Sequence, residues 1–195
     1  MIIRREYIIG GALLQEALTY ADLSGAYTSD RHDFHAGGLN NKKFKMFEGK
    51  LGEKAFKQFL TDNAIPFMED HSSWDERDEY DFLLKTVEAE YLLDVKTRTR
   101  SFHTRTLEMV EQAHSHPKDI FVSARLYPER SAVQLLGWYS YEDMMNANRI
   151  ENNGYLDNYV MYDSDLRPLD ELYRGLLVHC VGQQHDHFHV HRLRK

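Results

Sequence analysis

The sequence is poor in cysteine and lacks any long apolar run, and each shortage narrows the class of protein. Cys180 is the sole cysteine, which excludes an intramolecular disulfide and favours a reducing, cytoplasmic location. No apolar run approaches the roughly 20 residues that a membrane-spanning helix requires, so no membrane partner is expected. Residues 1–23 place basic residues ahead of an apolar stretch, as a signal peptide does. Polar residues interrupt that stretch, and the segment is better interpreted as an amphipathic helix.

The sequence also lacks an excess of positive charge. Its formal net charge is −7, which argues against a protein that binds nucleic acid by bulk attraction alone. The distribution of charge is more informative than the sum. A first group of lysines, typical of a solvated helix face, lies between residues 42 and 57, whereas acids gather in residues 69–79 and 151–171. A second basic group surrounds a chemical motif and consists of Lys96, Arg98, Arg100 and Arg105.

The 195 residues suit one domain, or one compact core with extensions, and 42% hydrophobic residues are enough to bury a sizeable core. Apolar periodicity predicts an α/β fold with one central mixed β-sheet flanked by helices. We expect residues 1–41 to form a helix and linker, 42–150 a core, and 151–195 an irregular C-terminal extension with a His-rich tail. The predicted helices cover 4–23, 43–62, 106–113 and 141–148, the predicted strands 65–68, 80–85, 90–99, 119–126 and 132–138, and a loop 27–41.

The motif begins at Asp94 and Lys96, which flank Val95 on a predicted strand. Alternation along a strand places both side chains on one face, and unpaired charges on an otherwise apolar strand are costly. Asp81 lies on the preceding predicted strand, and pairing of the two strands as a hairpin brings Asp81 close to Asp94. Two adjacent carboxylates repel each other, and a divalent cation relieves that repulsion. All-oxygen ligands suit Mg²⁺ or Mn²⁺.

A third acid is expected from the helix that precedes these strands. Glu53 borders the apolar face of that helix and can reach over the edge of the sheet, and Glu48 is the competing candidate. Gly49 and Gly52 would permit a close approach of helix to sheet, at some cost in helix stability.

A helix carrying G-E-x-A, followed by a hairpin carrying D…D-x-K, resembles the PD-(D/E)XK (restriction-endonuclease-like) nuclease superfamily. The segment DVKTRTRS is similar to the motif region of small Holliday-junction-resolvase-like endonucleases, and the resemblance covers roughly residues 45–140. It implies a sheet flanked by helices and Mg²⁺-dependent hydrolysis of DNA phosphodiester bonds. Asp81 matches the aspartate of the first half-motif, Asp94 and Lys96 match the second, and Glu53 matches the helical glutamate. Tyr80 stands where the family often has proline.

On this resemblance, Asp81, Asp94 and the Val95 carbonyl are expected to bind the metal, with Glu53 binding it directly or through water. Lys96 is expected to orient the attacking water or help to deprotonate it, and to offset charge on the phosphate. The expected contacts to nucleic-acid phosphates are Thr97, Arg98, Arg100 and Arg105, and Gln112 is expected to point towards the site.

Several alternatives stay open. The preferred interpretation is an endonuclease, and a structure-selective junction resolvase, an exonuclease or a catalytically inactive nucleic-acid-binding module on the same fold are the others. Asp94 and Lys96 can also form an ordinary ion pair on a solvent-facing strand. Many nucleases of this kind act as homodimers, and the negative charge outside the site is compatible with one. The tail places His185, His187, His189 and His191 at alternating positions, which favours a surface segment over a zinc site.

Overall fold

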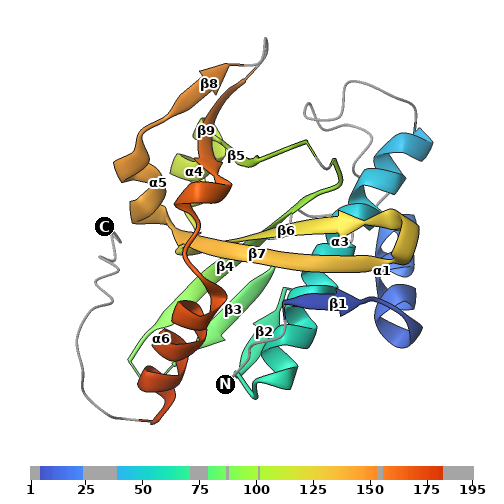
Figure 1. Cartoon of the computed structure of the whole chain (residues 1–195), viewed down its shortest axis with the longest axis horizontal. Helices are drawn as coiled ribbons and strands as arrows, with labels where there is room; N and C mark the ends of the chain where they lie inside the picture. The colour runs from blue at the N-terminus through green and yellow to red at the C-terminus, as the bar shows by residue number, and fades with distance from the viewer. Residues whose placement is uncertain are drawn as a thin grey trace.

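The computed structural model of this chain describes residues 5–23, 39–70, 79–86, 88–100, 102–152 and 156–181. Within them, a mixed six-stranded sheet has the strand order β1-β7-β6-β4-β3-β2, and a smaller three-stranded sheet has the order β5-β9-β8 (Figure 1). Helices flank both, which confirms the predicted α/β class with a central mixed sheet. Among the described residues, no helix combines the length and the apolar character needed to cross a membrane.

The centre of the large sheet is strand β4, Glu90–Arg98. It pairs antiparallel with β3, Phe82–Lys85, as the predicted hairpin, and parallel with β6, Ile120–Tyr127. All other neighbours in this sheet are antiparallel. The remaining strands of this sheet are β1 (Glu6–Ile8), β2 (Phe67–Glu69) and β7 (Ala132–Ser140).

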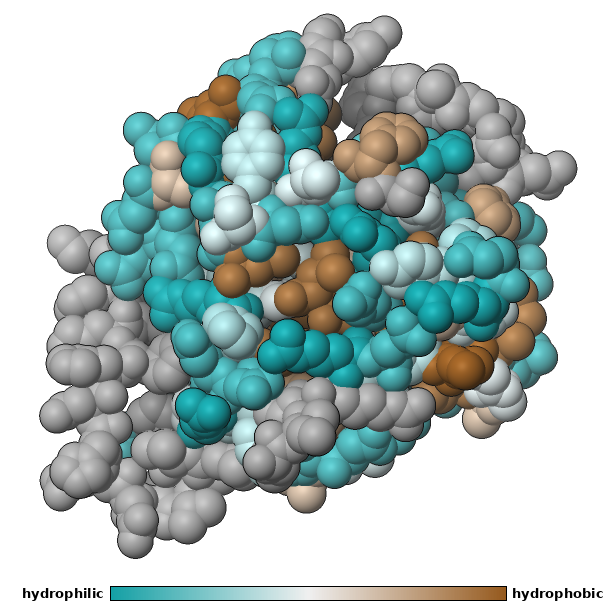
Figure 2. All heavy atoms as spheres, in the orientation of Figure 1, coloured by the Kyte–Doolittle hydropathy of each residue, from teal (hydrophilic) through white to brown (hydrophobic). Residues whose placement is uncertain are grey.

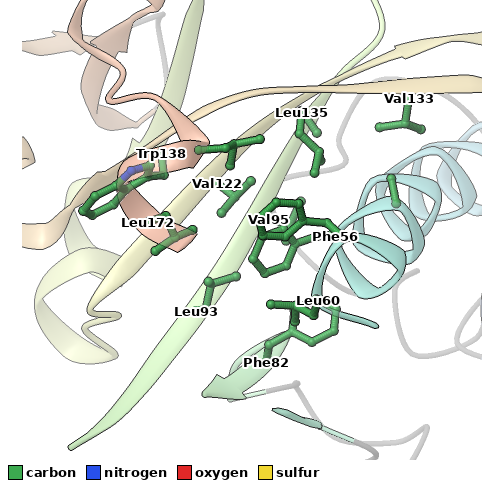
Figure 3. Packing of buried hydrophobic residues seen from close by; sticks show 14 of the residues in the cluster. Phe56, Leu60, Phe82, Leu93, Val95, Val122, Val133, Leu135, Trp138 and Leu172 are labelled. Carbon is green, nitrogen blue, oxygen red and sulfur yellow. The ribbon is translucent and has the colours of Figure 1, made fainter. Parts of the chain in front are cut away.

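Helix α3, Leu39–Asp62, covers one face of the large sheet. In Figure 3, Phe56 and Leu60 of α3 lie against Phe82 and Val95 of the sheet. The Phe56 and Phe82 rings meet edge to face with centroids 5.4 Å apart. Two further helices complete this layer, α1 (Gly11–Leu23) against α3 and α6 (Leu169–Val181) against β7.

The smaller sheet covers the opposite face. Its apolar contact with the large sheet is centred on Phe121 and Tyr139, whose stacked rings have centroids 5.0 Å apart. Strand β4 is therefore enclosed on both faces, by α3 on one side and by the smaller sheet on the other. The elements of this second layer are β5 (Arg105–Met109), α4 (Val110–Ser115), α5 (Tyr141–Ala147), β8 (Ile150–Asn152) and β9 (Asp157–Tyr162).

The surface is mainly polar on the face shown in Figure 2, where apolar residues form small groups, one of them near the middle of the view. Scattered apolar residues of this kind are normal on a monomeric protein surface.

Three predicted elements are wrong. Residues 4–23 do not form one helix, because β1 precedes α1: Tyr7 and Ile9 are buried while Ile8 is 72% exposed, and the positive φ of Gly11 marks the change of direction. Residues 106–113 divide into strand β5 and the short helix α4. The last forty residues are not irregular throughout, because they contain β9 and α6.

Helix α3 begins at Leu39, inside the predicted loop 27–41. The rest of that loop and the His-rich tail lie outside the described residues, and the predicted division into a core and two extensions stays a prediction.

Candidate active site

The candidate site lies at the N-terminal end of β3, beside β4. Asp81 immediately precedes β3, and the register that pairs Phe82 with Leu93 places Asp81 opposite Asp94. The Asp81 N–H donates to the Leu93 carbonyl at 3.0 Å, and its Oδ2 accepts from the Val95 N–H at 2.6 Å. Asp81 thus provides a hydrogen-bond acceptor for β4 at the point where β3 stops, and it holds its carboxylate against the backbone of the D-x-K motif.

The Val95 carbonyl points to this same open edge. On β4, Leu92 faces β6, because its N–H donates to Asp119 and its carbonyl accepts from the Asp119 N–H. The backbone groups of every second residue point to the same side of a strand, so those of Leu93 and Val95 face β3. A carbonyl oxygen therefore lies beside the Asp81 carboxylate without a strand opposite it.

Three carboxylates influence one another at this edge. Burial raises the pKa of Asp81 well above its ordinary value, and the charges of Glu53 and Asp94 raise it further, while Lys50 and the Val95 N–H oppose the shift. Glu53 reaches the site from α3 and accepts a hydrogen bond from Lys50 at 2.6 Å. Such a group of acids favours a cation or a proton in its midst.

Lys96 lies on the face of β4 that the smaller sheet covers. Its Nζ forms ion pairs with Asp94 Oδ2 and with Glu108 Oε2, each at 2.7 Å. Burial disfavours the charged form of Lys96, but the two acids outweigh it and hold the pKa above its usual range. An Asp94–Lys96 ion pair is therefore present, and it is not on a solvent-facing edge, because both faces of β4 are covered.

Glu108 is the residue that sequence reasoning missed. It lies on β5, and only 4% of it is exposed. The alternation of polar and apolar residues in Thr106-Leu107-Glu108-Met109 was the available sequence signal for a strand, yet the segment also suits a helix. That alternation would place Leu107 inside, whereas Thr106 and Glu108 are the buried residues.

A close contact between α3 and β4 positions Glu53. A Cβ added to Gly52 would lie 1.9 Å from Thr97 Oγ1, so only glycine allows this approach. The Thr97 hydroxyl donates to the Gly49 carbonyl at 3.2 Å, whereas a Cβ added to Gly49 meets nothing within 4 Å. The predicted close approach is thus confirmed at Gly52 and not at Gly49.

The predicted phosphate-binding residues are dispersed. Thr97 faces α3, and Arg98, 7% exposed, pairs with Asp163 at 2.6 Å. Arg105 pairs with Glu151 on the outer part of the smaller sheet. Arg100, beyond the end of β4, is the one of the four that is classed as exposed. Thr97 and Arg98 therefore each have a partner within the protein, and their contact with phosphate stays a prediction.

The two residues considered as additional candidates are Glu48 on α3 and Gln112 on α4. Glu48 is half-buried; burial raises its pKa, and Arg100 and Lys45 oppose the rise. Glu53, and not Glu48, is among the charges that act on Asp81. Gln112 is half-buried in α4, and its orientation towards the site stays a prediction.

The donor types at this edge match those of a hard divalent cation, which prefers carboxylate and carbonyl oxygens. The side chains, however, do not surround a cation position as they stand: among the described residues, no three Asp, Glu, His or Cys side chains form a group that could hold a metal ion. Lysines provide the physical reason, because Lys50 is paired with Glu53 and Lys96 with Asp94. A metal fits this donor set only if it displaces those ammonium groups from the carboxylates.

A cavity of about 610 Å³ opens beside the site, between α1, α3 and β2. Glu53 and Asp81 form part of its wall, so solvent and small ions reach these carboxylates from that side. Its far wall is stabilised by an ion-pair network, in which Lys54 and Lys57 of α3 each contact Glu16 of α1 and Glu69 of β2.

No protein-family description matches the sequence, and no curated protein matches it. Two solved structures are similar in part. One is a bacterial homing endonuclease, I-Ssp6803I, with a TM-score of 0.43, 9% identity, and coverage of 70% of this chain and 94% of that one. The other is D212, a nuclease from a fusselovirus, with a TM-score of 0.36, 13% identity, and coverage of 63% and 83%. Similarity at this level assigns no function, so the functional argument rests on the residues of this chain.

Proposed function

We propose that this chain is a metal-dependent nuclease that hydrolyses phosphodiester bonds of DNA, and that it acts as an endonuclease. The observation that carries the proposal is the juxtaposition of Asp81, Asp94 and Glu53 at the N-terminal end of β3. Lys96 follows Asp94 by two residues on β4 and pairs with it. The charges of Glu53 and Asp94 both act on the buried Asp81 carboxylate, and such a group of like charges favours a cation among its oxygen atoms.

The metal-binding residues in this proposal are Asp81, Asp94 and the Val95 carbonyl, with Glu53 bound directly or through water. Mg²⁺ or Mn²⁺, when bound there, supplies Lewis-acid polarisation of the scissile phosphate and a bound water of lowered pKa. The protein's part is to fix these oxygens: the hairpin register sets Asp81 against Asp94, and the Gly52 contact sets the height of Glu53 above the sheet.

Lys96 provides a fixed positive charge on the same face as Asp94. Its ammonium orients the attacking water and offsets the negative charge that develops on the phosphate, which is the largest kind of contribution in such sites. Arg100, exposed beyond the end of β4, is the candidate for contact with the DNA backbone that the fold leaves most open. Thr97, Arg98 and Arg105 each have a partner within the protein.

Cleavage of supercoiled plasmid in Mg²⁺, Mn²⁺ or EDTA tests the proposal. The informative variants are Asp94→Asn and Lys96→Met, which preserve side-chain size while removing charge. Matched controls are Asp62→Asn, at the exposed end of α3, and Lys85→Met, on the neighbouring strand, where Lys85 forms an exposed pair with Glu90.

We expect metal-dependent nicking that both site variants reduce by at least about 100-fold, as loss of a group that acts in the transition state implies, and that neither control changes. Conversion of closed circles identifies an endonuclease, and a requirement for free ends identifies an exonuclease. Parallel assays on branched and single-stranded DNA separate a junction resolvase from a general nuclease. DNA binding without cleavage, equal in all variants, would replace the nuclease with an inactive binding module.

A further inference from the structure

The environment of Glu108 is unusual for an acid outside the predicted motif. It is almost fully buried on β5, in the smaller sheet, and its carboxylate reaches across to Lys96 on β4 at 2.7 Å. Burying a carboxylate is costly unless it is paired, and Lys96 provides that partner. Lys96 is consequently held between two acids, one from each sheet.

The two acids compete for one ammonium group. Asp94 lies on the same strand as Lys96 and Glu108 on the facing sheet, at equal distances of 2.7 Å. Without Glu108, Asp94 would be the sole anionic partner that these contacts leave to Lys96, and an Asp94 carboxylate neutralised by lysine is a poor metal ligand. With Glu108 present, Lys96 keeps one ion pair after the Asp94 carboxylate has left it to bind a divalent cation. Glu108 itself has a second cation in its neighbourhood, since Lys118 acts on its charge as well.

We propose that Glu108 is a positioning residue: it gives the Lys96 ammonium a second carboxylate partner on β5, so that Asp94 can exchange its own pairing with Lys96 for a divalent cation. This inference rests on the proposed function and deepens it. It assigns to the smaller sheet a part in the active site, because β5 supplies the carboxylate that decides where the lysine of the motif lies.

A purely structural role for Glu108, as a polar link between the two sheets, must be distinguished from positioning. Thr106 provides the matched control. It lies two residues earlier on β5, is also buried, and links the same two sheets through a 2.6 Å hydrogen bond between its hydroxyl and that of Ser123 on β6. Thr106→Val removes this link while leaving the charges around Lys96 unchanged.

The experiment compares Glu108→Gln, Glu108→Asp and Thr106→Val with the unmodified chain. Isothermal titration with Mn²⁺ measures metal affinity directly, plasmid cleavage across Mg²⁺ concentrations measures the metal requirement, and urea unfolding reports folding. We expect Glu108→Gln to weaken Mn²⁺ binding by about 10–100-fold, the usual effect of losing a group that orients a ligand. Glu108→Asp keeps the charge on a shorter side chain, and its Mn²⁺ affinity is expected to lie between those of Glu108→Gln and the unmodified chain. Thr106→Val is expected to lower stability but to keep the affinity.

The outcomes separate this inference from the proposed function. Unchanged Mn²⁺ affinity in Glu108→Gln, or an equal loss of affinity in Thr106→Val, overturns the positioning role while leaving a nuclease in place. If the unmodified chain neither binds Mn²⁺ nor cleaves DNA, both proposals fall together. If Glu108→Gln cleaves DNA as the unmodified chain does at every Mg²⁺ concentration, Glu108 is a structural residue only.

Discussion

Replacement of Gly52 by alanine tests how the site is positioned. The new Cβ would lie 1.9 Å from Thr97 Oγ1, 3.0 Å from Thr97 Cβ and 3.2 Å from Thr97 Cγ2. Rotation of Thr97 about χ1 relieves the first contact but breaks its hydrogen bond to the Gly49 carbonyl and leaves the 3.0 Å contact in place. The helix must therefore move away from β4, by a distance on the order of 1 Å, before ordinary van der Waals separation is restored.

Two opposing terms set the size of the effect. Overpacking costs about 1–3 kcal/mol, and replacing glycine within a helix gains about 1 kcal/mol. Gly49→Ala provides the control, because it lies one turn away on the same helix and its added Cβ meets nothing within 4 Å. The propensity gain is common to both variants, so Gly52→Ala is expected to be less stable than Gly49→Ala by about 1–3 kcal/mol, the overpacking cost alone.

Urea unfolding of both variants measures this difference, and equal m-values establish that the unfolding reactions are comparable. Gly52→Ala is also expected to cleave DNA more slowly than Gly49→Ala, since the displaced helix carries Glu53 away from Asp81. The double variant Gly52→Ala/Thr97→Ala removes two of the three clashing atoms and is expected to recover part of the loss. Equal stability of Gly52→Ala and Gly49→Ala would refute the close contact on which the placement of Glu53 depends.

Three further predictions concern charge and packing. Burial disfavours ionisation of Glu69, but Lys54 and Lys57 outweigh it and lower the pKa of Glu69. The ionised Glu69 therefore stabilises the fold above its unfolded-state pKa, and this contribution is lost as pH falls. Glu69→Gln is expected to flatten the acid limb of the curve of unfolding free energy against pH. The pKa of Asp81 is raised, so its contribution to stability is lost as pH rises. At pH 8, Asp81→Asn is expected to raise Tm in EDTA and to abolish cleavage in Mg²⁺. Phe56→Ala empties a fully buried position and is expected to cost about 3–5 kcal/mol in urea unfolding.

The hairpin and its motif were predictable because their signals are local. The β3–β4 pairing follows from two apolar runs with a short turn, and the opposition of Asp81 and Asp94 follows from the register. Helix α3 was equally clear, since its apolar face alone fixes which side meets the sheet. Glu53 lies on α3, Asp94 lies on β4 and Asp81 immediately precedes β3, so the predicted carboxylate group depends on these elements alone.

The errors arose where tertiary pairing decides the structure. Strand β1 is three residues long and exists because β7 offers an edge to it, as the pairing of Tyr7 with Val133 shows. Strand β5 is specified by β9, some fifty residues later in the chain, and its Arg105–Tyr162 pairing has no local signal. Glu108 was missed for the same reason: its role depends on a sheet-to-sheet contact that periodicity within one segment does not reveal.

The placement of the candidate site at the end of β3 has a physical explanation. Strand β4 continues past β3 by several residues, so its backbone groups beyond Leu93 lack a neighbouring strand there. A buried strand cannot leave such groups unsatisfied, and Asp81 meets that need by accepting the Val95 N–H. The carboxylate that completes the sheet is thereby brought beside a second carboxylate and an available carbonyl. An incomplete edge within a sheet thus concentrates oxygen atoms at one point. A cation that binds these oxygen atoms in the folded state is therefore also expected to stabilise the fold.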